Sequence, residues 1–203
     1  ALPINLKEMN IDLLAFTGHK SLLGPTGTGG LLLSEKVDPA RIEPLMRGGT
    51  GSRSSEEAQP EDLPDRYESG TPNGIGIVGL GAAIAWLQER GLAMVRRHEV
   101  QLAGQLREGL RRIPGLKLYG PDDPQRSTTV VSFTLAGRRV SEIGQRLDEG
   151  FGVLCRVGLH CAPAAHRTLG TFPEGTVRLA PGIFTMPDEI AETIRAVEAI
   201  ARS

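Results

Sequence analysis

Long apolar runs are absent from this sequence: no stretch approaches the roughly 20 consecutive apolar residues that a membrane-spanning helix needs. The first residues also lack the basic and then apolar pattern of a secretory signal. Neither sign of charge dominates, because 23 basic and 24 acidic residues are mixed along the chain. Such a chain has no single-signed field to attract nucleic acid or an anionic membrane. We therefore expect a soluble, cytoplasmic protein that acts on a small neutral or zwitterionic molecule.

Cysteine and lysine are both scarce. Cys155 and Cys161 are too few for a disulfide framework in a chain of 203 residues. Cys155 ends the apolar run FGVLC, and because unpaired cysteine is commonly buried, we expect it in the core. Chemistry that needs a lysine amine has only four candidates, which are Lys7, Lys20, Lys36 and Lys117.

Apolar patterning in the first half predicts two strands and a helix. Residues 11–16 read as a buried strand that ends at a polar cluster, and residues 30–33 as a second strand after a loop rich in glycine and proline. Residues 47–73 have almost no apolar periodicity and predict a long irregular segment. Residues 75–90 predict a buried helix, capped by Asn73 and ended by Gly91.

Apolar residues in the second half follow the helical period in some segments and the strand period in others. A 3.6-residue period predicts a helix over residues 95–113, stopped by Pro114 and Gly115. Strands are predicted at 116–119, 128–135, 153–157 and 176–179, and a short helix at 140–149. Thr185, with Asp188 three residues on, is expected to cap a last helix that ends near residue 202. Helices packed on a small sheet are the expected arrangement.

Lys20 follows the first predicted strand, with His19 before it and the glycine-rich loop after it. By position alone it could be a surface lysine at a strand end. Residues 12–31, DLLAFTGHKSLLGPTGTGGL, resemble the cofactor-lysine segment of the class V aminotransferases and cysteine desulfurases, which depend on pyridoxal 5'-phosphate (PLP). The resemblance implies that Lys20 holds PLP covalently and moves protons at the substrate Cα, and that Thr17 and His19 lie near the cofactor phosphate.

A second motif, YESGTPN at residues 67–73, is similar to the E-x-G-T-P-N segment of the same family. In that resemblance Thr71 reaches the cofactor phosphate of the neighbouring subunit, which implies a homodimer. Thr-Pro-Asn ahead of a helix is also explained as a capping turn without any ligand. The two roles are compatible.

The third motif, RVGLHCAP at residues 156–163, resembles the loop of group II cysteine desulfurases, whose cysteine carries sulfur as a persulfide. That resemblance makes Cys161 the sulfur-carrying nucleophile, although Leu159 stands where the typical desulfurases have a second histidine. Zinc bound by His160, Cys161 and His166 is an alternative, but three candidates without a second close pair are a weak signal, so we expect no metal.

Farther on, Arg178 in the run GTVR matches the family arginine that binds the substrate α-carboxylate, although a strand arginine is otherwise usually a solvated charge.

The resemblance implies an α/β fold, the C-terminal part of a fold type I PLP-dependent transferase. We expect an incomplete large PLP-binding domain with its long loop at residues 1–72, then connecting helices and a small α+β domain at residues 73–203, the latter from about residue 93. Because the resemblance begins one strand before Lys20, the residues that stack on and pair with the cofactor ring would precede Ala1. The chain alone is therefore expected to bind PLP weakly and to be a poor catalyst.

The implied function is a cysteine desulfurase that releases sulfur from L-cysteine, leaves L-alanine and passes the sulfur to an acceptor protein. A class V aminotransferase or a selenocysteine lyase-like enzyme, in which Cys161 is incidental, shares the lysine and the arginine. A non-catalytic dimerisation fragment is the third alternative.

Overall fold

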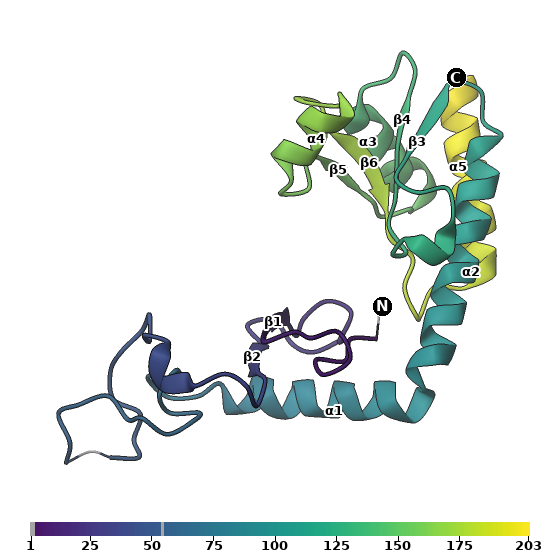
Figure 1. Ribbon diagram of the computed structural model, residues 1–203. Coiled ribbons are helices and arrows are strands. Elements are labelled where there is room, and N and C mark those ends of the chain that lie inside the picture. Colours follow the sequence, from purple (N-terminus) through teal and green to yellow (C-terminus); the bar gives the residue numbers. More distant parts are fainter. Residues whose placement is uncertain (1–2, 54) are drawn as a thin grey trace. The chain divides into compact units, whose positions relative to one another are not determined.

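A computed structural model describes residues 3–53 and 55–203, which form two compact units (Figure 1). The N-terminal unit covers residues 3–91 and the C-terminal unit runs from Leu92 to Ser203. The small domain expected from about residue 93 corresponds to the C-terminal unit. The first helix, which the sequence predicts as a connecting helix between residue 72 and the small domain, lies in the N-terminal unit.

The N-terminal unit is built on a hairpin and one helix. Strand β1 (Leu13–Thr17) pairs antiparallel with β2 (Gly29–Leu33), and residues 18–28 connect them. Helix α1 (Gly74–Arg90) begins where the Asn73 side chain accepts a hydrogen bond from the Gly76 N–H at 3.0 Å, and ends at Gly91, whose φ of +82° suits glycine. Both predicted ends of this helix are confirmed.

The prediction that the first strand is buried is wrong for this chain. Leu13 is 47% exposed, and Leu31 and Leu32 on the paired strand are 46% and 44% exposed. Among the described residues β1 and β2 form a two-stranded sheet with no third strand beside it. A two-stranded ribbon cannot cover both of its own faces, so apolar residues on it stay accessible.

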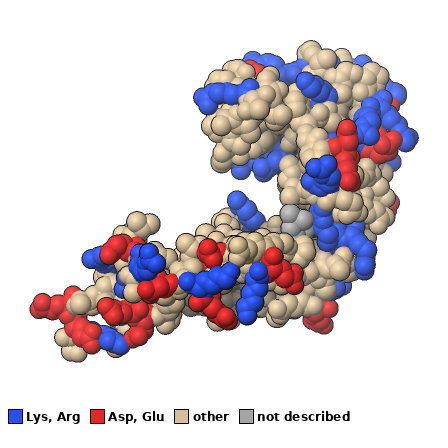
Figure 2. All heavy atoms as spheres, viewed as in Figure 1, with Lys and Arg blue, Asp and Glu red and all other residues tan. Residues whose placement is uncertain are grey.

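The segment between β2 and α1 is irregular, as predicted, apart from the short 3-10 turn η1 (Pro39–Arg41). Two neighbouring side chains hold it to that turn. Arg66 donates to the carbonyl oxygens of Ala40 and Ile42, both at 3.2 Å, and the Tyr67 hydroxyl donates to Pro39 O at 2.8 Å. Figure 2 shows basic and acidic side chains interspersed on this part of the unit, where Arg47 pairs with Glu43 and Arg53 pairs with Asp62.

The C-terminal unit contains an antiparallel sheet in the order β3-β4-β6-β5. Its strands are β3 (Leu116–Tyr119), β4 (Val131–Leu135), β5 (Arg156–Gly158) and β6 (Thr176–Leu179). Its helices are α2 (Leu92–Arg111), α3 (Val140–Phe151), α4 (Pro163–Leu169) and α5 (Pro187–Arg202), with a 3-10 turn η2 (Pro124–Arg126). The helices α2, α3 and α5 supply the apolar side chains that pack on the sheet.

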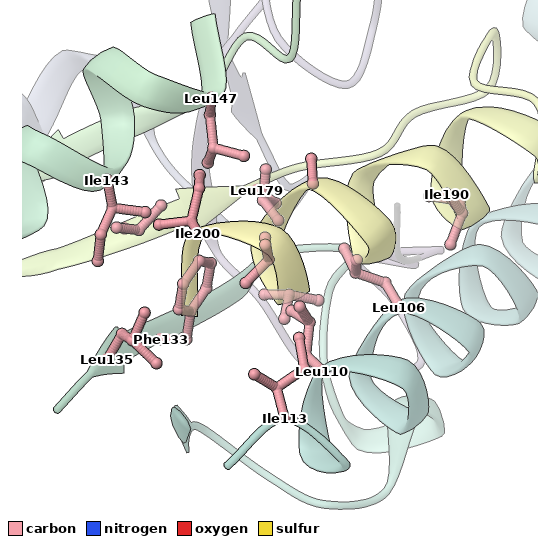
Figure 3. Close-up of a cluster of buried hydrophobic side chains, with 14 of the residues drawn as sticks. Leu106, Leu110, Ile113, Phe133, Leu135, Ile143, Leu147, Leu179, Ile190 and Ile200 are labelled. Carbon is pink, nitrogen blue, oxygen red and sulfur yellow. The ribbon is translucent and has the colours of Figure 1, made fainter. Parts of the chain in front are cut away.

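Alternation along the strands decides which face is covered. Phe133 and Val177 are opposite each other on β4 and β6 and are fully buried under the helices. Figure 3 shows Phe133 and Leu179 packed with side chains of α2, α3 and α5, among them Leu110 and Ile200. Since successive strand residues point to opposite faces, the residues between them point to the uncovered face of the sheet. Arg178 is one of these.

Several details of this unit differ from the sequence expectations. Strand β4 begins at Val131 rather than residue 128, and α2 begins at Leu92 rather than residue 95. Strand β5 begins at Arg156, three residues later than predicted, so Cys155 precedes it. Helix α4 was not predicted, because seven residues are too few to show an apolar period. Thr185 does not cap α5: its hydroxyl accepts from the Gly182 N–H at 3.0 Å, and the helix starts at Pro187.

In the described part of the chain no helix has the length and apolarity to cross a membrane.

Candidate active site

The Lys20 loop is closed on itself by backbone hydrogen bonds. Gly18 donates to Thr28 O at 2.8 Å and accepts from the Gly24 N–H at 2.9 Å, and the Leu23 N–H donates to Lys20 O at 2.9 Å. Lys20 thus opens a tight turn at the end of β1 rather than lying in a flexible chain. The loop is a fixed platform for its exposed side chains.

Glycine is required at the buried position before His19. A Cβ at Gly18 would lie 2.3 Å from Thr28 Oγ1 and 3.1 Å from Leu80 Cδ1 of α1. Helix α1 also brings its small residues against this loop, since a Cβ on Gly79 would lie 2.7 Å from Pro25 Cγ. Close approach of helix and loop therefore fixes the segment that carries Lys20.

Thr17, His19 and Lys20 are all exposed around this platform. Within residues 3–53 and 55–203 the Lys20 amine has no ion pair or hydrogen bond. A free amine, a hydroxyl and an imidazole on one short segment are the donors that an aldehyde bearing a phosphate requires. The chemistry of this donor set fits PLP.

Thr71 is exposed and lies in the same unit, two residues before the cap of α1. The Gly70 N–H beside it donates to Gly49 O at 2.8 Å, which ties the SGTPN segment to the glycine-rich start of the irregular segment. The capping role of the motif is borne by Asn73, so the Thr71 hydroxyl is left for another partner.

Cys161 lies in the C-terminal unit on a turn that leaves β5. The Ala162 N–H donates to Leu159 O at 2.8 Å, and the two central residues, His160 and Cys161, have φ values of +50° and +62°. Turns with two positive φ values normally use asparagine, aspartate or glycine. The turn is therefore strained at His160 and Cys161, and it leaves the Cys161 thiol exposed.

His160 is held from the sheet side. Its Nε2 lies 3.0 Å from Thr176 O and 3.1 Å from Thr176 Oγ1. Because a carbonyl oxygen can only accept, Nε2 carries the proton in this contact. Burial lowers the pKa of His160, and the charge of Arg178 lowers it further, against the raising effect of the Thr176 bond. A lowered pKa favours the neutral form of the ring, in which the Nε2 proton points to Thr176 and Nδ1 is the unprotonated nitrogen.

The path from β5 to Cys161 depends on two glycines. Gly175 has a φ of +80°, and a Cβ on it would lie 2.0 Å from Gly158 O.

Replacing Gly175 with alanine is expected to cost about 2–4 kcal/mol of unfolding free energy, because backbone rather than a flexible side chain must move. Urea denaturation followed by circular dichroism measures this. Gly150→Ala is the control: it adds a Cβ in open space on a helix and should leave the midpoint unchanged or slightly raised.

Arg178 faces Arg156 directly across the β5–β6 pair, on the uncovered face of the sheet. Like charges opposite each other destabilise a sheet unless an anion lies between them. Both guanidinium groups also act on His160, since each lowers its pKa. Arg156 is the first residue of the RVGLHCAP motif, but the sequence predicted no role for it. The strand register, which only the fold supplies, shows it beside Arg178.

Cys155 is half-buried and packs against the hydrophobic core, and burial raises the pKa of its thiol. This agrees with the structural role predicted for it. His160 and His166 lie with ring centroids 5.7 Å apart, but each ring is engaged by a threonine. In the part of the chain that the structure covers, no group of three histidine, cysteine or acidic residues is placed to hold a metal.

The six predicted site residues thus fall into two groups: Thr17, His19, Lys20 and Thr71 in the N-terminal unit, and Cys161 and Arg178 in the C-terminal unit. Residues 1–192 match the family model of the class-V aminotransferases. A probable cysteine desulfurase of Methanothermobacter thermautotrophicus is 34% identical to this chain over an alignment of 203 positions, which covers 98% of this chain and 50% of that protein.

Solved structures are also similar to this chain over nearly its whole length. A cysteine desulfurase from Thermococcus onnurineus superimposes with a TM-score of 0.86 at 31% identity, covering 98% of this chain and 49% of that one. A cystine C-S lyase in complex with cysteine persulfide gives a TM-score of 0.76 at 25% identity, covering 97% of this chain and 49% of that one. This chain spans about half the length of the relatives it matches. It belongs to the class-V aminotransferase family.

Proposed function

We propose that this chain carries the lysine and the cysteine of a PLP-dependent cysteine desulfurase, which converts L-cysteine to L-alanine and an enzyme-bound persulfide. The observation that carries the proposal is the strained turn that exposes the Cys161 thiol in the unit that also holds the Arg156–Arg178 pair. Family membership and the names of its relatives support it.

Each residue has a task in this proposal. When bound, PLP supplies an electron sink for the bonds at the substrate Cα. Lys20 would hold it and move the proton at Cα, while the Thr17 and His19 side chains would bind its phosphate. Thr71 would reach the phosphate of the cofactor in the neighbouring subunit. Arg178 fixes the substrate carboxylate with two parallel N–H···O bonds.

Sulfur transfer is the task of Cys161. Its thiolate attacks the substrate sulfur, and an S–S bond forms as the Cβ–S bond breaks. The electron pair of the broken bond stays with the substrate carbon, which takes up a proton and leaves as alanine. The sulfur remains on Cys161 as a persulfide, from which an acceptor protein takes it.

Replacing Arg178 with leucine is expected to raise the KM for cysteine about 10- to 100-fold, because a charge-assisted hydrogen bond to the carboxylate is lost. The kcat should fall much less. Sulfide release in the presence of PLP and a thiol reductant, measured against cysteine concentration, gives both constants. Arg195→Leu removes an exposed arginine of α5 and serves as the control. An unchanged KM in Arg178→Leu would remove this residue from the substrate site.

A C-S lyase or an aminotransferase in which Cys161 is incidental is the second candidate function. It is favoured by the likeness to the cystine C-S lyase, and it shares the tasks of Lys20 and Arg178. Selenocysteine as substrate is compatible with the same residues. Retention of full activity in a Cys161 variant would favour this candidate.

We also propose a homodimer in the cytoplasm, in which a second copy covers the apolar side of α1. Ile75 is 91% exposed and Val78 is 74% exposed on this helix. Residues this apolar are rarely left in water on a surface helix without a partner. Sedimentation of the chain at several concentrations tests this.

A further inference from the structure

The turn at Leu159–Ala162 needs support from outside, because neither of its central residues favours a left-handed backbone. Cys161 is exposed, so its own side chain supplies no packing that could hold the turn. His160 is the other central residue, and its ring is half-buried. The conformation of the turn therefore depends on what holds the His160 ring.

One edge of that ring is fixed by Thr176, which is almost completely buried. The other ring nitrogen, Nδ1, is buried and has no hydrogen-bond partner among the described residues. The Thr176 contact alone leaves the ring free to tilt about this one edge. A second support is required to fix its plane.

His166 provides this support. It is 5% exposed on α4, and its ring centroid lies 5.7 Å from that of His160 with the planes tilted by 50°. His166 Nδ1 shares a hydrogen bond of 2.7 Å with the Thr171 hydroxyl, and Thr171 is itself buried. The His166 carbonyl oxygen also accepts from the Thr171 and Phe172 N–H groups, at 2.9 and 3.2 Å. The position of His166 is thus set on both its side chain and its backbone.

We propose that His166 and Thr171 are positioning residues for Cys161. Thr171 fixes the His166 ring, the His166 ring fixes the plane of His160, and His160 holds the left-handed turn that presents the thiol. Leu159 leaves the turn with one histidine, and α4 brings a second histidine to it from five residues beyond Cys161. This inference rests on the proposed role of Cys161 in sulfur transfer.

The test is Thr171→Val, which keeps the shape of the side chain and removes the hydroxyl. We expect the rate of persulfide formation on Cys161 to fall roughly tenfold with an unchanged KM for cysteine, because the thiol is misplaced while Arg178 is untouched. Thr171→Ser should restore the rate. Thr168→Val in α4, three residues before Thr171, is the matched control, since among the described residues its exposed hydroxyl bonds only to Ala164 O, at 3.2 Å.

A second readout does not depend on activity. Imidazole nitrogen chemical shifts should show His160 as the single Nε2–H tautomer in the natural chain and as a mixture of tautomers in Thr171→Val. His166→Asn, which keeps a polar group near Thr171 but removes the ring, should give the same mixture if Thr171→Val does not fold. An unaltered His160 signal in the folded variant overturns the positioning role.

The two readouts separate the two proposals. If the natural chain forms no persulfide on Cys161 but the His160 signals change in Thr171→Val, the sulfur-transfer function fails and the support of the turn stands. If persulfide forms at the natural rate in Thr171→Val, the positioning role fails and the proposed function stands.

Discussion

Replacing Lys20 with alanine is expected to abolish the adduct that borohydride fixes between this chain and PLP. The Lys20 amine is exposed at the head of a closed loop and has no partner among the described residues. A free lysine amine on a rigid element is what covalent attachment of an aldehyde cofactor needs. Peptide mapping of the reduced chain should place a single adduct on Lys20 in the natural sequence and none in the variant.

The other lysines of the chain supply the controls, because each has a partner. Lys7 pairs with Glu35 at 3.7 Å, Lys36 donates to Asn10 Oδ1 at 2.8 Å, and Lys117 lies over the Tyr119 ring at 5.2 Å. Lys7→Ala should leave the adduct intact. An adduct that persists at full yield in Lys20→Ala would contradict the cofactor site.

Replacing Cys161 with serine is expected to abolish the persulfide formed with cysteine as substrate. The hydroxyl of serine cannot carry sulfur, and Cys161 is the exposed thiol of the two. Intact-mass measurement after incubation with cysteine and PLP should show a sulfur atom added to the natural chain and none to the variant. Thiol-labelling of the quenched sample locates it.

Cys155→Ser is the matched control, and it should keep the persulfide. Burial raises the pKa of the Cys155 thiol, which lowers the fraction of reactive thiolate at neutral pH. Persulfide on Cys155, or undiminished sulfide release by Cys161→Ser, would favour the C-S lyase or aminotransferase candidate instead.

Local chemistry settled much of this protein in advance. The run around Lys20, the Thr-Pro-Asn turn before α1 and the His-Cys turn are each contiguous, so their residues are neighbours whatever the fold. Helix caps are local as well, which is why Asn73 and Gly91 end α1 as predicted. Apolar periodicity was also enough to predict the helices α2 and α3, because buried apolar residues recur along each of them over several turns.

Only the tertiary structure decided which distant residues meet. Strand register places Arg156 opposite Arg178, and the return of the chain after α4 brings Thr171 to His166 and His166 to His160. The exposure of β1 likewise depends on which elements lie beside it, and its apolar residues do not reveal that. Pairing across a sheet and packing between elements are set by the whole fold, and no pattern within a single segment encodes them.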